Sequence, residues 1–203
     1  RVDLPPGGFR PVWLTVSVPA RANPGLYRGS LTVAGEGGRQ ISFPLELKVL
    51  DARLPDPDEW AFYLDLWQHP WAVARYHGVK PFSPEHYRLL EPIYRELGGA
   101  GQKALTVTIT DLPWNHQNFD AYHTLIPRVK NKDGNWTFDY ALFDEYVAFG
   151  RRCGIGPHIH CYTMATWGNR VSYTDGQTGD TVRPVIRPGT PEHEAYWGPF
   201  LQD

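Results

Sequence analysis

Aromatic rings and hydrogen-bonding side chains gather where loops are expected to follow three strands. The groups are Trp67, His69 and Trp71, then Trp114, Asn115 and His116, and finally Tyr162 and Trp167. A saccharide presents apolar C–H faces ringed by hydroxyl groups, so a site for it combines flat aromatic platforms with Asp, Asn and His side chains. These residue types therefore predict a carbohydrate-binding surface. The alternative is that some indoles, among them Trp71, Trp136 and Trp197, only fill space between the loops and the core.

Each of the three predicted strands carries one polar face. Apolar residues alternate with Tyr63, Asp65, Trp67 and His69 in segment 61–69, with Thr106, Thr108 and Thr110 in segment 105–110, and with His158, His160 and Tyr162 in segment 158–164. A parallel barrel interior that only supports the fold is filled by Val, Ile and Leu, and the site of such a barrel lies at the C-terminal ends of its strands. The polar faces favour a hydrogen-bonding pocket there. The alternative is that these groups satisfy one another or buried water.

Helix signals separate these strands. Ser83-Pro84-Glu85 combines an N-cap with Pro at the first helical position and predicts a helix to about Leu97. A second helix is expected from about Asp139 to Arg152, and Thr190-Pro191-Glu192 repeats the start signal. Strands that alternate with helices indicate right-handed βαβ units and a parallel sheet. The expected fold class is therefore α/β, with about three βα units of a partial (β/α)8 TIM-like barrel.

The N-terminal residues follow a period of two instead. Apolar residues alternate with polar ones over 12–18, 26–33 and 41–49, which predicts antiparallel strands with one buried face. We expect residues 1–51 to be the C-terminal strands of a β-sandwich, residues 52–60 to be a linker, and residues 61–203 to be the first, truncated part of the barrel.

Composition and charge exclude several classes of protein. The 203 residues include 20 basic and 22 acidic side chains without a block of like charge, which argues against nucleic acid or an anionic membrane as a partner. No apolar run approaches the roughly 18 residues that a membrane helix needs. Cys153, His158, His160 and Cys161 are close in sequence, but alternation along a strand points Cys161 away from the two histidines. We expect free buried thiols, no disulfide, no metal and no cofactor.

Several segments resemble the first part of the catalytic barrel of glycoside hydrolase family 123. They are Tyr63-Leu64-Asp65-Leu66-Trp67-Gln68-His69-Pro70, Pro113-Trp114-Asn115, Asp133-Gly134-Asn135-Trp136, Phe138-Asp139-Tyr140 and Cys161-Tyr162. Val18-Pro19 and Pro24-Gly25-Leu26-Tyr27-Arg28-Gly29 similarly resemble the end of the β-sandwich that precedes that barrel. The resemblance covers nearly the whole chain and is specific at 66–70 and 113–115.

The resemblance implies a retaining exo-β-N-acetylgalactosaminidase that uses the acetamido group of its substrate as the nucleophile. The family supplies the acid and the stabilising carboxylate as an adjacent Asp-Glu pair. By order along the chain that pair is expected beyond residue 203, so the chain alone is expected to be inactive and to need the remainder of its barrel. The substrate, a glycan with an N-acetylhexosamine, is expected to contact Asp65, Trp67, His69, Trp114, Asn115 and Tyr162. An extracellular or periplasmic location is expected.

Two other hypotheses remain open. One is a non-catalytic carbohydrate-binding protein on a degenerate barrel, which keeps the aromatic residues and lacks the acid pair. The other is that Asp65 and Asp111 form a carboxylate pair that acts on a glycoside without help from an acetamido group. Alternatively, Asp65 only hydrogen-bonds inside the barrel and Asp111 only begins a turn.

Overall fold

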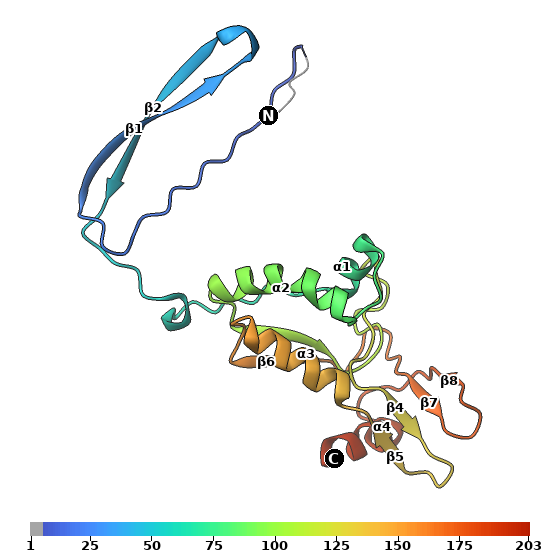
Figure 1. Cartoon of the computed structure of the whole chain (residues 1–203). Coiled ribbons are helices and arrows are strands. Elements are labelled where there is room, and N and C mark those ends of the chain that lie inside the picture. The colour runs from blue at the N-terminus through green and yellow to red at the C-terminus, as the bar shows by residue number, and fades with distance from the viewer. Residues whose placement is uncertain (1–5) are drawn as a thin grey trace. The chain divides into compact units, whose positions relative to one another are not determined.

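The computed structural model of the protein describes residues 6–203 and has a mixed α/β fold (Figure 1). The chain divides into two compact units, one that ends at Pro55 and one that comprises Asp56–Asp203. The boundary falls within segment 52–60, where the sequence predicts a linker. Within the described residues there are four α-helices and three separate sheets.

The N-terminal unit contains one long β-hairpin. Strands β1 (Gly25–Ala34) and β2 (Gln40–Val49) pair antiparallel over their full length, and the short 3-10 helix η1 (Glu36–Gly38) connects them. Facing polar pairs support the hairpin, since Arg28 Nε lies 2.7 Å from Glu46 Oε1. The strands predicted over 26–33 and 41–49 are thereby confirmed. Neither face of the hairpin is fully covered by the residues described, because Phe43 on one face is 48% exposed and Leu26 on the other is 51% exposed.

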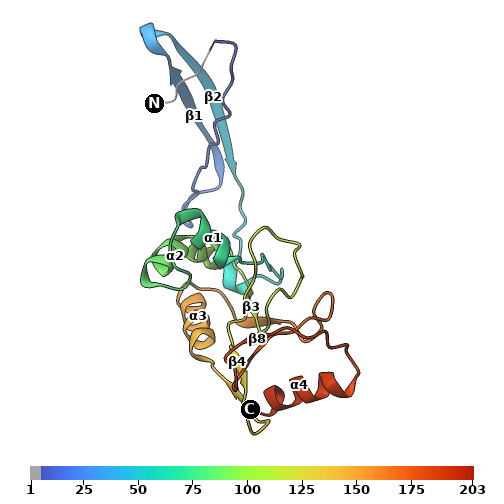
Figure 2. The ribbon, with the colours of Figure 1, turned by 90° about the vertical axis from the view of Figure 1, so that its right-hand side faces the viewer.

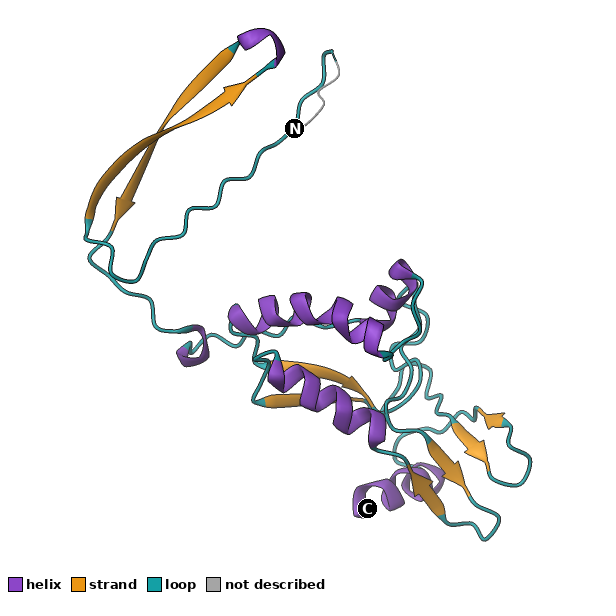
Figure 3. Cartoon of the chain, in the orientation of Figure 1, coloured by secondary structure: helices purple, strands orange, loops and turns teal. Residues whose placement is uncertain are grey.

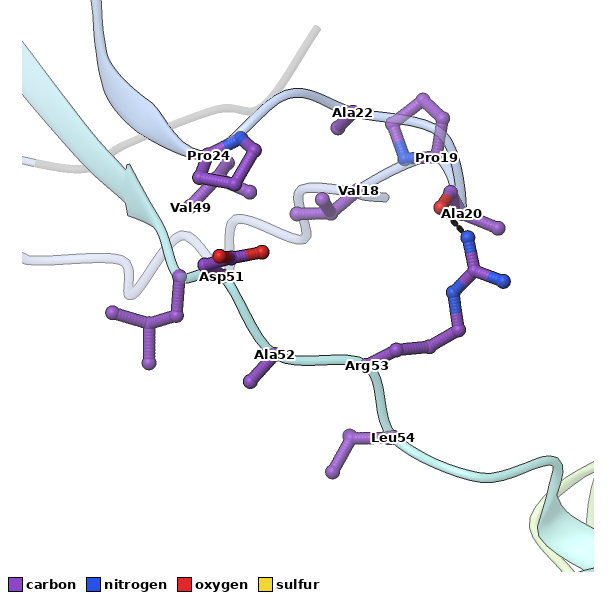
Figure 4. A pocket seen from close by; sticks show the side chains of 11 residues that line it. Val18, Pro19, Ala20, Ala22, Pro24, Val49, Asp51, Ala52, Arg53 and Leu54 are labelled. Carbon is purple, nitrogen blue, oxygen red and sulfur yellow. Dashed lines mark hydrogen bonds between the residues drawn. The ribbon is translucent and has the colours of Figure 1, made fainter.

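Segment 12–18, which alternates like a strand, is an extended coil. Trp13 is 91% exposed and Val12 71% exposed, and the segment has no strand partner among the residues described. The prediction of a third strand is therefore wrong for this structure, because alternation marks a face that could be buried and supplies no hydrogen-bonding partner. The end of this segment instead lines a cavity of about 480 Å³ together with 49–54, where the Arg53 guanidinium donates to the Ala20 carbonyl at 2.7 Å (Figure 4).

The C-terminal unit is organised around two parallel strands. Strands β3 (Ala104–Thr108) and β6 (His158–Tyr162) lie side by side and point the same way (Figure 3). Helices α2 (Pro84–Gly99) and α3 (Ala141–Arg152) run alongside them. Leu90 and Tyr94 from α2, Leu105 and Val107 from β3 and Tyr146 from α3 belong to one buried core. The two predicted helices and the parallel pairing are confirmed.

The segment 61–69 runs beside β3 without forming the predicted strand. It makes one parallel bridge, between Leu64 and Gln102, and Phe62 and Leu66 are exposed instead of facing the helices. Beyond the bridge, the amide side chains of Gln68 and Gln102 fill the gap between the two backbones. The Leu66 N–H donates to Gln102 Oε1 at 3.0 Å, and the Thr106 N–H donates to Gln68 Oε1 at 2.8 Å. Buried glutamines thus replace ladder hydrogen bonds, which satisfies the backbone but defeats a prediction made from alternation.

The remaining elements lie at the two ends of this unit. Near its start are the 3-10 helix η2 (Pro57–Glu59) and helix α1 (Pro70–His77). At the other end lie a small sheet and α4 (Pro191–Gln202), away from α1 and α2 in both views (Figures 1 and 2). The sheet has the order β5 (Trp136–Phe138), β4 (Arg128–Lys130), β7 (Tyr173–Asp175) and β8 (Thr181–Val182). The helix start predicted at Thr190 is confirmed, since its side chain accepts from the His193 N–H at 3.3 Å.

His86 at the start of α2 is buried in its neutral form. Its Nδ1 accepts from the Phe82 N–H at 2.8 Å and its Nε2 donates to the Pro70 carbonyl at 3.0 Å, so a second ring proton would meet another N–H. Burial, together with the charge of His77, lowers the pKa of His86 below 6.5. Above that pH the group does not change stability with pH, and stability should fall as the pH drops through 6.5 towards the lowered pKa, by up to about 1.4 kcal/mol per pH unit.

The measurement is urea unfolding at several pH values between about 7.5 and about 5. His86→Asn is the matched variant, because its amide oxygen can accept from the Phe82 N–H and cannot titrate. The free energy of unfolding of this variant should change less steeply with pH than that of the parent protein, and the difference in slope should correspond to at most one bound proton. This expectation holds even if the variant is less stable overall. Equal slopes for the two proteins would contradict the assignment.

Candidate functional site

Three aromatic side chains from separate loops and strands meet at the C-terminal ends of β3 and β6. Trp67 lies near the end of segment 61–69 beside β3, Trp114 lies in the loop after β3, and Tyr162 is the last residue of β6. The ring centroids of Trp67 and Trp114 are 4.8 Å apart in a stacked arrangement, and each lies about 5 Å from Tyr162. Trp67 is 52% exposed, whereas Trp114 is 7% exposed. We call these three residues the aromatic cluster. Trp67 is its exposed member, and the buried Trp114 packs against the Trp67 ring.

Tyr122 joins the aromatic cluster to His69. Its ring lies 4.8 Å from Trp114 and stacks at 3.8 Å on the His69 imidazole. His69 Nε2 donates to the Asp120 carbonyl at 3.1 Å, and burial lowers the pKa of this histidine, which favours the neutral ring. His69 is thus held against the loop that follows β3 and does not contact Asp65. Tyr122 lies in a loop without periodic sequence, so no pattern marked it as a site residue.

Asp65 belongs to a hydrogen-bonded chain beside the aromatic cluster. Its Oδ2 lies 2.9 Å from Nδ1 of His160, and Nε2 of the same ring lies 2.8 Å from the Tyr63 hydroxyl. In a neutral ring with the proton on Nδ1, Nε2 accepts from the Tyr63 hydroxyl. The ring centroids of His160 and Tyr162 are 6.4 Å apart. Burial, together with the negative charge of Asp65, raises the pKa of the Tyr162 hydroxyl. We call Tyr63, Asp65 and His160 the polar triad.

The register of β3 and β6 explains why these groups converge. Thr106 pairs with His160 and Thr108 with Tyr162, so the polar faces of the two strands coincide as the alternation predicts. The three threonines of β3 and its end are buried. Thr106 Oγ1 accepts from the Gln68 N–H at 3.4 Å and the Thr108 hydroxyl donates to the His123 carbonyl, whereas Thr110 Oγ1 has no hydrogen-bond partner among the described residues. The expected hydrogen-bonding surface is therefore formed by the aromatic and histidine side chains, while Thr106 and Thr108 follow the alternative in which polar groups satisfy their neighbours.

Asn115 lies in a different place from the aromatic cluster. Asn115 adopts a left-handed backbone conformation, with φ 56°. Its backbone N–H donates to the Leu112 carbonyl at 2.8 Å and closes a turn. Asn115 lines a cavity of about 410 Å³, and Trp167 lines the same cavity. The structure thus brings Trp67, Trp114 and Tyr162 into contact, sets Asp65 beside them, and leaves His69 and Asn115 outside the cluster.

Asp111 is held by its surroundings. Its Oδ2 accepts from the Ser172 hydroxyl at 2.6 Å and its Oδ1 from the Thr124 N–H at 2.9 Å. Asp65 contacts His160, so the two carboxylates are tied to different partners, which argues against a pair that acts together on a glycoside. Both cysteines are free, Cys153 buried and Cys161 exposed, and the expectation that both are buried is wrong for Cys161. No group of three metal-binding side chains occurs in the described part of the chain.

Comparison with known proteins identifies the family. Residues 67–203 match the family model described as the glycoside hydrolase 123 catalytic domain. The chain belongs to glycoside hydrolase family 123. A solved family 123 glycoside hydrolase from Clostridium perfringens, described in terms of glycolipid glycan hydrolysis, matches with a TM-score of 0.86 and 29% sequence identity. The match covers 92% of this chain and 34% of the Clostridium chain, so the chain spans about a third of the length of that protein. No curated protein matches the chain.

Membership of family 123 relates residues 67–203 of the chain to the catalytic domain of glycoside hydrolases. The matched region begins at Trp67, the exposed member of the aromatic cluster, and includes Trp114 and Tyr162. The aromatic cluster of this family 123 chain is therefore the surface best suited to the apolar face of a sugar ring. No helix in the described residues has the length and hydropathy to cross a bilayer.

Proposed function

We propose that the protein is part of a retaining exo-β-N-acetylgalactosaminidase in which the acetamido group of the substrate acts as the nucleophile. The family match supports glycoside hydrolysis, and one observation carries the site: a half-exposed Trp67 stacked on a buried Trp114 at the C-terminal ends of parallel strands. A rigid indole face of this kind offers stacking area to the C–H side of a hexosamine at little entropic cost.

The fold proposal follows from the same residues. The segment 64–68, β3 and β6 run parallel in this order, and helices follow each of them, as in an arc of a (β/α)8 barrel. We assign residues 61–203 to that barrel, residues 52–60 to a linker, and residues 1–51 to the end of a β-sandwich. The acid and the acetamido-orienting carboxylate are assigned to an Asp-Glu pair outside this sequence. A location outside the cytoplasm, extracellular or periplasmic, belongs to the same proposal.

The decisive assay uses the full-length protein that contains this sequence. We expect hydrolysis of a chromogenic β-N-acetylgalactosaminide, slower hydrolysis of its 4-epimer, and none of the matching β-galactoside, which lacks the acetamido nucleophile. Proton NMR of the first product should show a retained β-anomer. Hydrolysis of the β-galactoside at a similar rate would contradict the substrate-assisted mechanism.

A second function is favoured by the way the carboxylates are held. Among the described residues, Asp65 and Asp111 both have protein partners, so the chain could belong to a non-catalytic carbohydrate-binding protein with the same aromatic cluster. Binding of N-acetylgalactosamine by the full-length protein without hydrolysis of any glycoside would support that function.

Trp67→Ala should lower kcat/KM for the acetamido substrate about tenfold in the full-length protein. The variant removes the open stacking surface, and burying an aromatic side chain against a ligand contributes about 1.5–3 kcal/mol, part of which Trp114 can still supply. Because Trp67 is 52% exposed, the substitution should change the unfolding midpoint little. Trp13→Ala is the matched control, since Trp13 is 91% exposed and lies in the N-terminal unit. Equal activity of the two variants would remove Trp67 from the site.

A further inference from the structure

The segment 170–185 forms a longer hairpin than β7 and β8 alone. The pairs between β7 and β8 and the antiparallel bridge between Arg170 and Val185 share one register, so Arg183 lies opposite Ser172. Alternate residues of a strand lie on the same face. Arg170, Ser172 and Arg183 therefore share one face of this hairpin.

The opposite face of the hairpin is fixed in the core. Val171 is buried and its N–H donates to the Pro184 carbonyl at 3.2 Å, while Tyr173 packs against the core. Ser172 is held from both sides, since its hydroxyl donates to Asp111 and its carbonyl accepts from the Tyr196 hydroxyl at 2.8 Å. The two arginines thus extend from a rigid scaffold, which lowers the entropic cost of binding a ligand there.

The arginine-bearing face forms one wall of the cavity of about 410 Å³ that Asn115 lines. This volume lies within the roughly 300–1,000 Å³ of small-molecule sites. The loop 111–116 forms another wall, and Trp167, which is 57% exposed, contributes an aromatic ring. The loops that line the cavity adjoin the loop that carries Trp114, because Asn115 follows Trp114 in the chain and the backbone N–H of Trp167 donates to the Pro113 carbonyl at 2.9 Å.

The charged side chains that line this cavity carry a net positive charge. Arg170 and Arg183 are exposed, and neither guanidinium forms an ion pair with any residue in the described part of the chain. Asp111 is the one formal anion in the lining, and its two oxygens already accept from Ser172 and Thr124. Two guanidinium groups beside an indole and an Asn side chain suit a planar or tetrahedral anion carried on a sugar ring.

We propose that this cavity is a subsite for a negatively charged saccharide unit, which carries a sulfate ester or a carboxylate and is joined to the sugar that stacks on Trp67. The inference rests on the proposed function, because it extends the same glycan from the aromatic cluster into the cavity. Arg170 and Arg183 hold the anionic group, Trp167 contacts the ring that bears it, and Asn115 bonds a hydroxyl. The subsite selects acidic glycans over neutral ones.

The test compares three oligosaccharides that end in the same β-N-acetylhexosamine and differ in the next sugar, which is neutral, sulfated or a uronic acid. For the full-length protein we expect kcat/KM to be at least about tenfold higher for one or both charged substrates, and this preference should shrink as ionic strength rises. The double variant Arg170→Gln/Arg183→Gln should lose the preference, bringing the ratio near unity. Arg88→Gln, on the exposed side of α2, is the matched control and should retain it.

Calorimetric binding of the same oligosaccharides separates the two proposals. If no acetamido substrate is hydrolysed, the proposed function fails, and tighter binding of a charged oligosaccharide that depends on both arginines still supports the subsite. If the neutral substrate is hydrolysed and the charged ones are neither preferred nor bound more tightly, the subsite is overturned and the proposed function stands. A preference that survives in the double variant also overturns it.

Discussion

Gly98→Ala should lower the free energy of unfolding of the C-terminal unit by at least about 3 kcal/mol, at the upper end of overpacking costs. A Cβ at Gly98 would lie 2.1 Å from the Cys153 carbonyl oxygen and 2.9 Å from the Gly154 carbonyl carbon. Both neighbours are backbone atoms at the end of α3, so no side chain can rotate out of the way. The last turn of α2 and the end of α3 would have to separate, which opens the core between them.

Gly99→Ala is the control for this prediction. Gly99 is the next residue of α2, and a Cβ there meets nothing within 4 Å. Alanine has a higher helix propensity than glycine by up to about 1 kcal/mol, so this variant should be as stable as the parent or slightly more stable. Urea unfolding followed by circular dichroism measures both variants. Similar midpoints for them would show that the contact between Gly98 and Cys153 is not close.

The sequence predicts the elements of the C-terminal unit best where a local signal and a period agree. Ser83 caps α2 and accepts from the His86 N–H at 3.2 Å, and Thr190 caps α4, as their positions before Pro and Glu indicate. Strands β3 and β6 follow apolar alternation and pair in parallel because a helix separates them. In these cases the physical cause of the element lies within a few residues of it.

Prediction fails where the cause lies in a distant partner. Segment 61–69 alternates as well as β3 does, yet it bonds mainly to glutamine side chains, and the role of Gln102 depends on a residue 36 positions away. Segment 12–18 has the pattern of a strand and no neighbour to pair with among the described residues. The sheet β5-β4-β7-β8 consists of strands of two or three residues, too short for a period to be recognised.

The same limit applies to the candidate site. Residue types and the strand ends where they occur predict an aromatic cluster that includes Trp67, Trp114 and Tyr162. Their relative burial is not predictable, because Trp114 is covered by Tyr122, a residue of an irregular loop. The arginines of the acidic-glycan subsite share a face only through the register of the 170–185 hairpin. A sequence pattern therefore finds the groups that can bind a sugar, and tertiary pairing decides which of them face it.

Asp65→Asn should lower kcat/KM for the acetamido substrate about 100-fold in the full-length protein. Its carboxylate orients His160 through the 2.9 Å contact to Nδ1 and places negative charge beside Tyr162 in the aromatic cluster. A hydrogen bond to a charged group contributes about 1.5–3 kcal/mol, and the upper end corresponds to about 100-fold. Asparagine keeps the size of the side chain, so the thermal unfolding midpoint should change little. Asp133→Asn, in the exposed turn between β4 and β5, is the control and should be fully active.

A double-mutant cycle distinguishes positioning from separate effects. If Asp65 acts by holding His160, then His160→Gln should cost nearly as much activity as Asp65→Asn, and the double variant should be little worse than either single variant. Tyr63→Phe, which removes the hydroxyl 2.8 Å from His160 Nε2, should have a smaller effect because it leaves the charged contact intact. Multiplicative losses in the double variant would mean that Asp65 and His160 contact the substrate independently. A strongly coupled pair would mean that the polar triad acts as one unit, which fixes the His160 imidazole beside Tyr162 of the aromatic cluster.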